Sequence, residues 1–338
     1  MSESLDTSIF LDVRDYLTEG IYWLVVIGGR GIGKTYSGLD WLQEDDGMLY
    51  VRNQREEIDL CATPEGNPFK KLNKDKGYNY DFLKTRGIHH IVNEVDGKLE
   101  KRGMAISLAT AGKLKGFDFS DSKRIVWDEF IPDPDLVVRF NEGQAFLRFY
   151  ETVNRNRELL GEPPVPVVML SNATQLASNA LYALGIADVV ENMVRNEIRR
   201  RTIPERGIRI IIPEMKELVE KKALTSLYKA AGVKSKFSRH SLDNQFVNVS
   251  LENVVKRKLI EYLPLCSFED LYLYIHKSRN EYYVSYSHHN AEHYTELDTR
   301  ELFIRRFFAM KDLMLNGTFK YESYQIKKRF INIFFKYQ

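Results

Sequence analysis

The segment GGRGIGKT has the residue types and the spacing of a phosphate-binding loop. It consists of Gly28, Gly29, Arg30, Gly31, Ile32 and Gly33, followed by Lys34 and Thr35. The glycines allow the main chain to wrap its NH groups around an anion, and a helix that begins at Lys34 adds its positive end. Lys34 is expected to reach the β and γ phosphates, and the Thr35 hydroxyl to bind Mg²⁺. The segment therefore predicts a site for ATP and Mg²⁺.

A pair of acids follows another apolar run, in RIVWDEF. Asp128 at the end of a neighbouring buried strand would reach the metal ion beside Thr35. The adjacent Glu129 would take a proton from an attacking water, which indicates hydrolysis rather than simple nucleotide binding. Asn172 follows the next apolar run, where its side chain would bind the γ phosphate or that water.

Two arginines in TVNRNRE, Arg155 and Arg157, are candidates for stabilising charge on the transferred phosphoryl group. They lie on a predicted helix just before the strand that carries Asn172. The sequence does not choose between the two, and both would also be ordinary on a solvated surface. An arginine in this place is expected to project toward a neighbouring subunit, which would make oligomerisation part of the chemistry.

The elements that must position these residues are strands alternating with helices. Apolar runs typical of buried strands end at Gly28, at the two acids and at Ser171–Asn172, and the remaining strands are short. The predicted strands are 21–27, 48–52, 124–127, 165–170 and 207–213, with a hairpin over 88–109 that turns at Asp96–Gly97. This alternation predicts an α/β fold with a mainly parallel sheet, which binds its ligands at the carboxyl ends of the strands.

The chain changes character after this sheet. A helix of strong formers is predicted over 214–231, followed by a joint, a hairpin in LYLYIHK and EYYVSYS, and two helical stretches over 299–315 and 321–337. We therefore expect a domain over 1–212, a helical linker over 213–244 and a smaller α+β domain over 245–338.

The composition of the chain limits which partners and which cellular compartment we expect. The 338 residues have a formal net charge of only +2, but Arg195–Arg239 contains thirteen Lys or Arg against five Glu. Such a basic stretch favours a polyanionic partner, although charged helix faces are also common. The two cysteines match no metal or redox spacing, which favours a reducing cytoplasm, and no apolar run is long enough to span a membrane.

Taken together, GGRGIGKT, YVR, VWDEF, VNRNRE, LSNA and SLDNQF resemble, in this order, the DNA packaging ATPases of short-tailed phages of the phi-29 type. The resemblance covers about residues 21–250. It implies an ATP-driven motor subunit that moves double-stranded DNA into a procapsid through the portal. It further implies a pentameric ring in the host cytoplasm, docked transiently at the portal vertex, and raises the question of a structural packaging RNA.

Carried over residue by residue, the resemblance makes Lys34 and Thr35 the Walker A pair, Asp128 and Glu129 the Walker B pair, and Arg155 the finger that acts on the next subunit. Arg55 and Lys115 resemble basic positions near a subunit interface or the DNA. The implied fold is a P-loop NTPase of the additional-strand catalytic-glutamate type, followed by an RNase H-like domain.

Two questions stay open at the level of the sequence. The acids of the C-terminal domain, which are Glu269, Asp270, Glu281, Asp298 and Glu301, lie at strand edges rather than strand centres, so we expect no nuclease activity. The alternative function is a nucleotide-gated assembly factor that performs no mechanical work, and replacement of Glu129 by Gln would distinguish it from a motor.

Overall fold

The chain divides into two compact units, Met1–Val247 and Asn248–Gln338. The computed structural model describes residues 9–132, 141–173, 176, 178–231, 253–295 and 303–335. The expected division with a linker over 213–244 remains a prediction, because much of that segment lies outside the described residues, as does SLDNQF.

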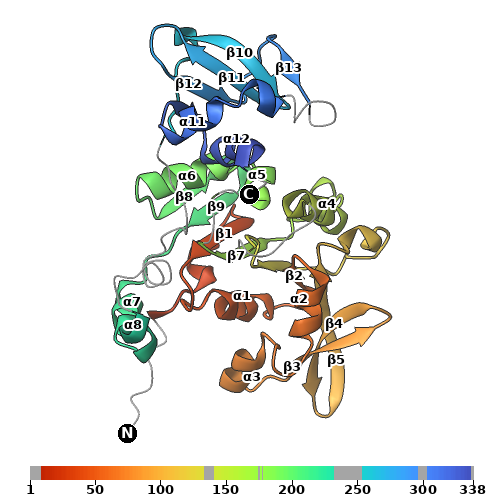
Figure 1. The fold of residues 1–338 in the computed structure, drawn as a ribbon. Helices are drawn as coiled ribbons and strands as arrows, with labels where there is room; N and C mark the ends of the chain where they lie inside the picture. The colour runs from red at the N-terminus through yellow and green to blue at the C-terminus, as the bar shows by residue number, and fades with distance from the viewer. Residues whose placement is uncertain are drawn as a thin grey trace. The chain divides into compact units, whose positions relative to one another are not determined.

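The first unit contains a nine-stranded mixed sheet in the described part of the chain (Figure 1). Its spatial order is β3 (Tyr80–Thr85), β4 (Ile88–Val95), β5 (Lys98–Ser107), β2 (Met48–Arg52), β6 (Arg124–Asp128), β7 (Val167–Asn172), β1 (Trp23–Gly28), β9 (Ile208–Ile211) and β8 (Arg200–Ile203). The pairs from β5 through β9 are parallel, and the β3–β4–β5 and β8–β9 pairs are antiparallel. The sheet is therefore mostly parallel where the predicted site residues lie.

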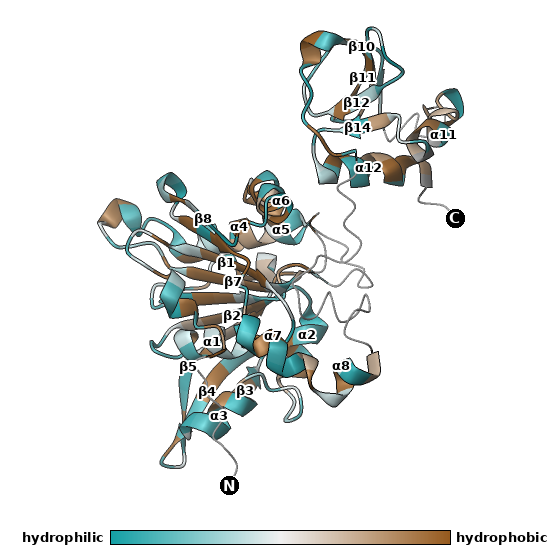
Figure 2. Cartoon of the chain, turned by 90° about the vertical axis from the view of Figure 1, so that its left-hand side faces the viewer, coloured by the Kyte–Doolittle hydropathy of each residue, from teal (hydrophilic) through white to brown (hydrophobic). Residues whose placement is uncertain are grey.

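The central strands are apolar along most of their length because helices cover both faces of the sheet. Figure 2 shows β1, β2 and β7 as hydrophobic segments. On one face, α1 (Lys34–Leu42) packs so closely that a Cβ on Gly38 would lie 2.6 Å from Leu170 Cδ1. On the other face, Phe146 of α4 (Glu142–Asn154) stacks on Trp127 with ring centroids 4.3 Å apart. This packing fixes the strand ends that carry the polar residues.

The remaining α-helices described in the first unit are all shorter than α4. They are α2 (Arg55–Cys61), α3 (Lys70–Lys76), α5 (Asn179–Ala183), α6 (Ala187–Arg195), α7 (Lys216–Ala223) and α8 (Ser226–Ala231). None of the helices in the described ranges has the length and apolar composition needed to cross a bilayer.

The predicted strands and the hairpin over 88–109 are confirmed, with ends that shift by a few residues. The single helix expected over 214–231 is wrong, because α7 ends at Ala223 and α8 begins at Ser226. Thr225 explains the break: its hydroxyl donates to the Lys222 carbonyl at 2.8 Å and its NH donates to the same oxygen at 2.9 Å. A side chain that bonds its local backbone in this way competes with the regular helical ladder.

The second unit is built on a five-stranded sheet within the described residues. Its spatial order is β13 (His293–Tyr294), β10 (Tyr262–Phe268), β11 (Leu271–His276), β12 (Tyr282–Ser285) and β14 (Phe319–Tyr321). The predicted hairpin is β11–β12, and its apolar side packs with α11 (Met310–Leu315) and α12 (Tyr324–Phe335). The helical stretch over 321–337 corresponds to α12, whereas that over 299–315 is interrupted between residues 307 and 309. Of the strands in this unit, β10, β13 and β14 were not predicted.

Candidate functional site

The phosphate-loop segment turns tightly between β1 and α1. Gly31 and Gly33 have positive φ angles of 69° and 93°, a region that side-chain-bearing residues rarely adopt. The loop closes around the Lys34 ammonium, which donates to the carbonyls of Gly28 at 3.1 Å and Gly29 at 2.6 Å. Lys34 is buried, and burial lowers its pKa to about 8. The loop therefore holds the Lys34 ammonium in a buried position.

Asn172 meets this lysine from the next strand. Its Oδ1 accepts a hydrogen bond from Lys34 Nζ at 3.0 Å, and it lies at the carboxyl end of β7, paired with Gly28 of β1. The sequence prediction thus has a structural counterpart: Asn172 reaches the lysine that is expected to bind phosphate.

Asp128 and Thr35 form a second group at the same edge. The Thr35 hydroxyl donates to the two Asp128 carboxylate oxygens at 3.1 and 3.3 Å, and the Tyr50 hydroxyl donates to Asp128 Oδ2 at 3.1 Å. Both Asp128 and Tyr50 are buried, and burial raises the pKa of Tyr50 well above its usual value. A hydroxyl and a carboxylate are hard oxygen donors of the kind that Mg²⁺ prefers.

Glu129 adopts an unusual backbone conformation directly after β6. Its φ of 53° lies in the left-handed region, its NH donates to Asp128 Oδ1 at 3.1 Å, and 47% of its side chain is exposed. Its carboxylate accepts from Arg52 Nη2 at 2.5 Å, and Asn53 donates to its main-chain oxygen at 2.8 Å. The acid is therefore accessible to water and at the same time held by a cation.

These groups enclose one cavity of about 490 Å³ at the carboxyl edge of the sheet. Its walls come from the phosphate loop, the first turn of α1, the two acids at the end of β6, and Ser171 and Asn172 at the end of β7. Lys34 supplies positive charge, Asp128 and Thr35 supply oxygen donors, and Glu129 supplies a base. Together they can bind a polyphosphate with a divalent ion and accept a proton from water.

The structure does not bring the two candidate arginines to this cavity. Arg155 caps the end of α4 with a φ of 40°, is exposed, and donates to the Phe117 carbonyl at 2.6 Å. Arg157 donates to the carbonyls of Ser120 at 3.1 Å and Ser122 at 3.4 Å. These carbonyls precede β6, so both arginines lie at the amino edge of the sheet.

The two arginines differ in how they are held. Arg157 also forms an ion pair with Glu162 at 3.2 Å, and only 14% of its side chain is exposed. Arg157 thus ties together the segments that precede β6 and β7. Arg155 remains accessible to another molecule.

The two other basic candidates also lie away from the cavity lining. Arg55 is the first residue of α2, half exposed and 3.6 Å from Asp59. Lys115 is exposed, just after the short helix η3 (Ala111–Leu114). Their expected role at an interface or on DNA remains a prediction.

Sequence reasoning missed three residues of the site. Arg52 holds Glu129 and also contacts Glu57 at 3.0 Å, and Tyr50 contacts Asp128. Lys222, in the last turn of α7, donates to the Arg30 carbonyl. Arg52 could have been found from its position at the end of a predicted strand. Lys222 could not have been found in this way, because α7 carries no motif.

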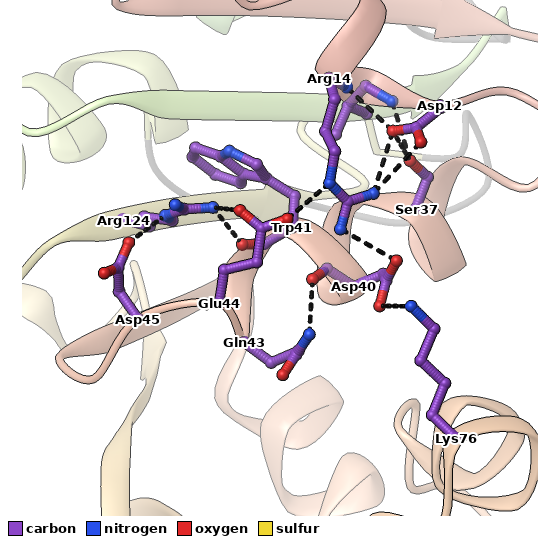
Figure 3. Close-up of polar contacts among 11 residues, drawn as sticks. Asp12, Arg14, Ser37, Asp40, Trp41, Gln43, Glu44, Asp45, Lys76 and Arg124 are labelled. Carbon is purple, nitrogen blue, oxygen red and sulfur yellow. Dashed lines mark hydrogen bonds and ion pairs between the residues drawn. The ribbon is translucent and has the colours of Figure 1, made fainter.

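A polar network on the far part of α1 fixes the helix that begins with Lys34 (Figure 3). Arg14 donates to Glu44 at 2.5 Å and to the buried Asp40 at 2.9 Å, and Ser37 accepts from the Val13 NH at 2.8 Å. The segment before β1 is thereby clamped to α1. The network positions the helix rather than taking part in the chemistry of the cavity.

Comparisons with known proteins agree with this arrangement. Residues 5–337 match the family described as Podovirus DNA encapsidation protein (Gp16). The chain is 27% identical over 259 residues to the DNA packaging protein of Bacillus phage phi29, which covers 75% of this chain and 70% of that protein.

Two solved structures show the same fold. A chain of the bacteriophage Phi-29 viral genome packaging motor assembly has a TM-score of 0.64 and 20% identity, covering 98% of this chain and 100% of that chain. A chain of the Phi-28 gp11 DNA packaging motor has a TM-score of 0.59 and 18% identity, covering 97% and 98%.

Proposed function

The chain belongs to the podovirus DNA encapsidation protein family of phage DNA packaging motor proteins, and we propose that it drives packaging by hydrolysing ATP at the cavity at the carboxyl edge of its sheet. One observation carries this proposal: Lys34, Thr35, Asp128, Glu129 and Asn172 converge on that cavity from three neighbouring strands. This convergence supports our proposal that the first unit is a P-loop NTPase of the additional-strand catalytic-glutamate type.

The residues at the cavity fit a Mg²⁺ ion. Thr35 and Asp128 already lie within 3.3 Å of each other, and both offer hard oxygen donors. When bound, the ion would neutralise charge on the β and γ phosphate oxygens. Tyr50 would keep the Asp128 carboxylate oriented through its hydrogen bond.

Glu129 is our candidate for the general base. Its exposed carboxylate would accept a proton from the water that attacks the γ phosphate, while Lys34 and Asn172 orient the phosphate. Arg52 Nη2 bonds one of the two carboxylate oxygens of Glu129, Oε2, so the pair would have to separate for that oxygen to accept the proton.

The charge needed to stabilise the transferred phosphoryl group would come from a second copy of the chain. Arg155 is exposed but lies at the opposite edge of its own sheet, so we propose that it enters the cavity of a neighbouring subunit in a ring. A pentamer on the portal, acting on double-stranded DNA in the host cytoplasm with or without a packaging RNA, is the assembly that the phi-29 type suggests.

The C-terminal unit is proposed to be an RNase H-like domain that does not cleave DNA. Asp270 is held by Arg329 at 2.6 and 2.9 Å, and Glu281 is held by Arg257 at 3.0 Å. Asp298 and Glu301 lie outside the described residues. Mn²⁺-dependent nicking that disappears in Asp270→Asn would refute this proposal.

The test of the proposed function is an ATPase assay of the purified chain with and without duplex DNA. We expect DNA to stimulate turnover and the stimulation to fall steeply as salt rises, because the grip on the phosphate backbone releases counterions. Turnover that ignores DNA at every salt concentration would instead favour the nucleotide-gated assembly factor.

A further inference from the structure

Helix α7 contacts the phosphate loop, although Lys222 and Arg30 are 192 positions apart in the sequence. Leu218 of α7 is buried with Ile32 of the loop and Ile9 of the N-terminal segment. One turn further along, the Lys222 ammonium donates to the Arg30 carbonyl. An apolar contact and a polar contact therefore connect the helix to the loop.

The position of the Lys222 ammonium is defined by the loop glycines. It would lie 3.2 Å from a Cβ placed on Gly31, so it lies directly over the loop. It also lies 5.6 Å from the centre of the Tyr228 ring, on α8. Lys222 thus stands between the phosphate loop and the next helix of the chain.

Lys222 adds positive charge to a site that already contains a buried lysine. After burial itself, Lys222 is the main influence that lowers the pKa of Lys34, against the opposing effect of Asp128. Two ammonium groups and the exposed Arg30 side chain therefore share the region around the loop. An anion with several charges would relieve their repulsion, whereas the Arg30 carbonyl offers Lys222 only a neutral acceptor.

We propose that Lys222 is a phosphate-sensing residue of the nucleotide site, which exchanges the Arg30 carbonyl for the phosphates of bound ATP and so links their arrival to α7 and α8. This inference rests on the proposed function, because it requires ATP in the cavity. If the Lys222 ammonium moved from the Arg30 carbonyl to the phosphates, the end of α7 would move toward them and Lys222 would shift relative to Tyr228. The same cation could instead bind phosphates of the DNA backbone, and the experiment separates these two sources.

The test compares Lys222→Met with Lys221→Met in the full-length chain. Methionine keeps the apolar stem and the helix propensity of lysine, and Lys221 is a matched control whose ammonium bonds Glu217 on its own helix at 2.7 Å. We expect Lys222→Met to weaken MgATP binding about ten- to a hundredfold, the range for a lost charged hydrogen bond. Lys221→Met should stay within about twofold, since exposed ion pairs contribute little.

Hydrogen exchange of the α7 and α8 amides supplies a second readout. MgATP should slow exchange in the wild type and in Lys221→Met, but not in Lys222→Met at saturating MgATP. Equal affinities and equal protection in the two variants would overturn the proposal, and so would a Lys222→Met variant that loses affinity for duplex DNA alone.

The wild type and Lys34→Ala separate this inference from the proposed function. If the wild type binds MgATP and Lys34→Ala does not, an unchanged Lys222→Met refutes only the sensing role. If the wild type fails to bind MgATP, both proposals fall.

Discussion

The two edges of the large sheet place charged residues in opposite ways. At the carboxyl edge, Lys34, Asp128 and Glu129 line one cavity, where Lys34 donates to Asn172 and Arg52 donates to Glu129. At the amino edge, Arg155 and Arg157 donate to main-chain carbonyls. One chain therefore has the candidate nucleotide-binding residues at one edge of its sheet and the exposed Arg155 at the other.

The accessible residue at each edge, Glu129 or Arg155, has an unusual backbone conformation. Glu129 and Arg155 have positive φ angles, 53° and 40°, although neither is glycine. Such conformations cost free energy, on the order of 1 kcal/mol or more, and persist where surrounding structure holds them, often at functional positions. In a ring, the accessible residue of one edge would meet that of the other across a subunit boundary.

Replacing Arg155 by Ala should have the largest effect on ATP turnover of the substitutions at the two edges. We expect ATP turnover in the assembled motor to fall about 10³- to 10⁵-fold, the range for a lost arginine finger, while ATP binding is kept. Steady-state hydrolysis and nucleotide binding measure the two properties.

Mixed rings test whether Arg155 acts across a boundary. Lys34→Ala subunits retain Arg155, and Arg155→Ala subunits retain the phosphate loop, so their mixture should recover hydrolysis that neither has alone. Absence of recovery would place the role of Arg155 within one chain or remove it.

The affinity for MgATP should depend on pH because of the buried Lys34 at the carboxyl edge. Lys34 has a pKa of about 8 in the free protein, and its charged form is the one that attracts phosphate. The phosphates of ATP are already ionised in this range, so above about pH 8 each unit should weaken MgATP binding about tenfold, as Lys34 must regain its proton. Below pH 8 the affinity should level off.

The control for this titration is Lys34→Ala, whose weak residual binding should lack the step near pH 8. Affinity of the wild type that stays flat from pH 7 to 9.5 would contradict the assigned role of Lys34.

Replacing Arg157 by Ala should affect stability rather than chemistry. Its side chain is only 14% exposed and donates to two carbonyls, whereas the ion pair with the exposed Glu162 contributes little, so its loss should cost about 1.5–3 kcal/mol of unfolding free energy. For a unit of this size the Tm should fall by about 3–10 °C, and Arg155→Ala should fall by less. A thermal melt in which Arg155→Ala is the less stable variant would reverse our assignment of the two arginines.

Local motifs made part of the site predictable. The phosphate loop specifies its own backbone through its glycines. The positions of the acids at the end of β6 and of Asn172 at the end of β7 follow from strands that end at one edge. The amino-edge position of Arg155 was implied by a helix leading into a strand, but its contact with Phe117 was not.

Contacts between distant segments were not predictable in the same way. The Arg52–Glu129 bond joins residues 77 positions apart, and the Lys222–Arg30 bond joins residues 192 positions apart. In the second unit, β14 has only three residues, and β10 contains Pro264, which strand patterns disfavour. Both strands form because a neighbouring strand offers an edge, which is tertiary information.

The most direct test of our central claim is a single-turnover measurement on the Glu129→Gln motor with MgATP and duplex DNA. Gln preserves the shape of Glu129 but cannot take a proton, so we predict that ATP binds with wild-type affinity within a few fold. Cleavage should slow about 10²- to 10⁴-fold, and DNA uptake should stop. Cleavage and DNA uptake at wild-type rates would show that the carboxyl edge of this sheet is not where the motor splits ATP.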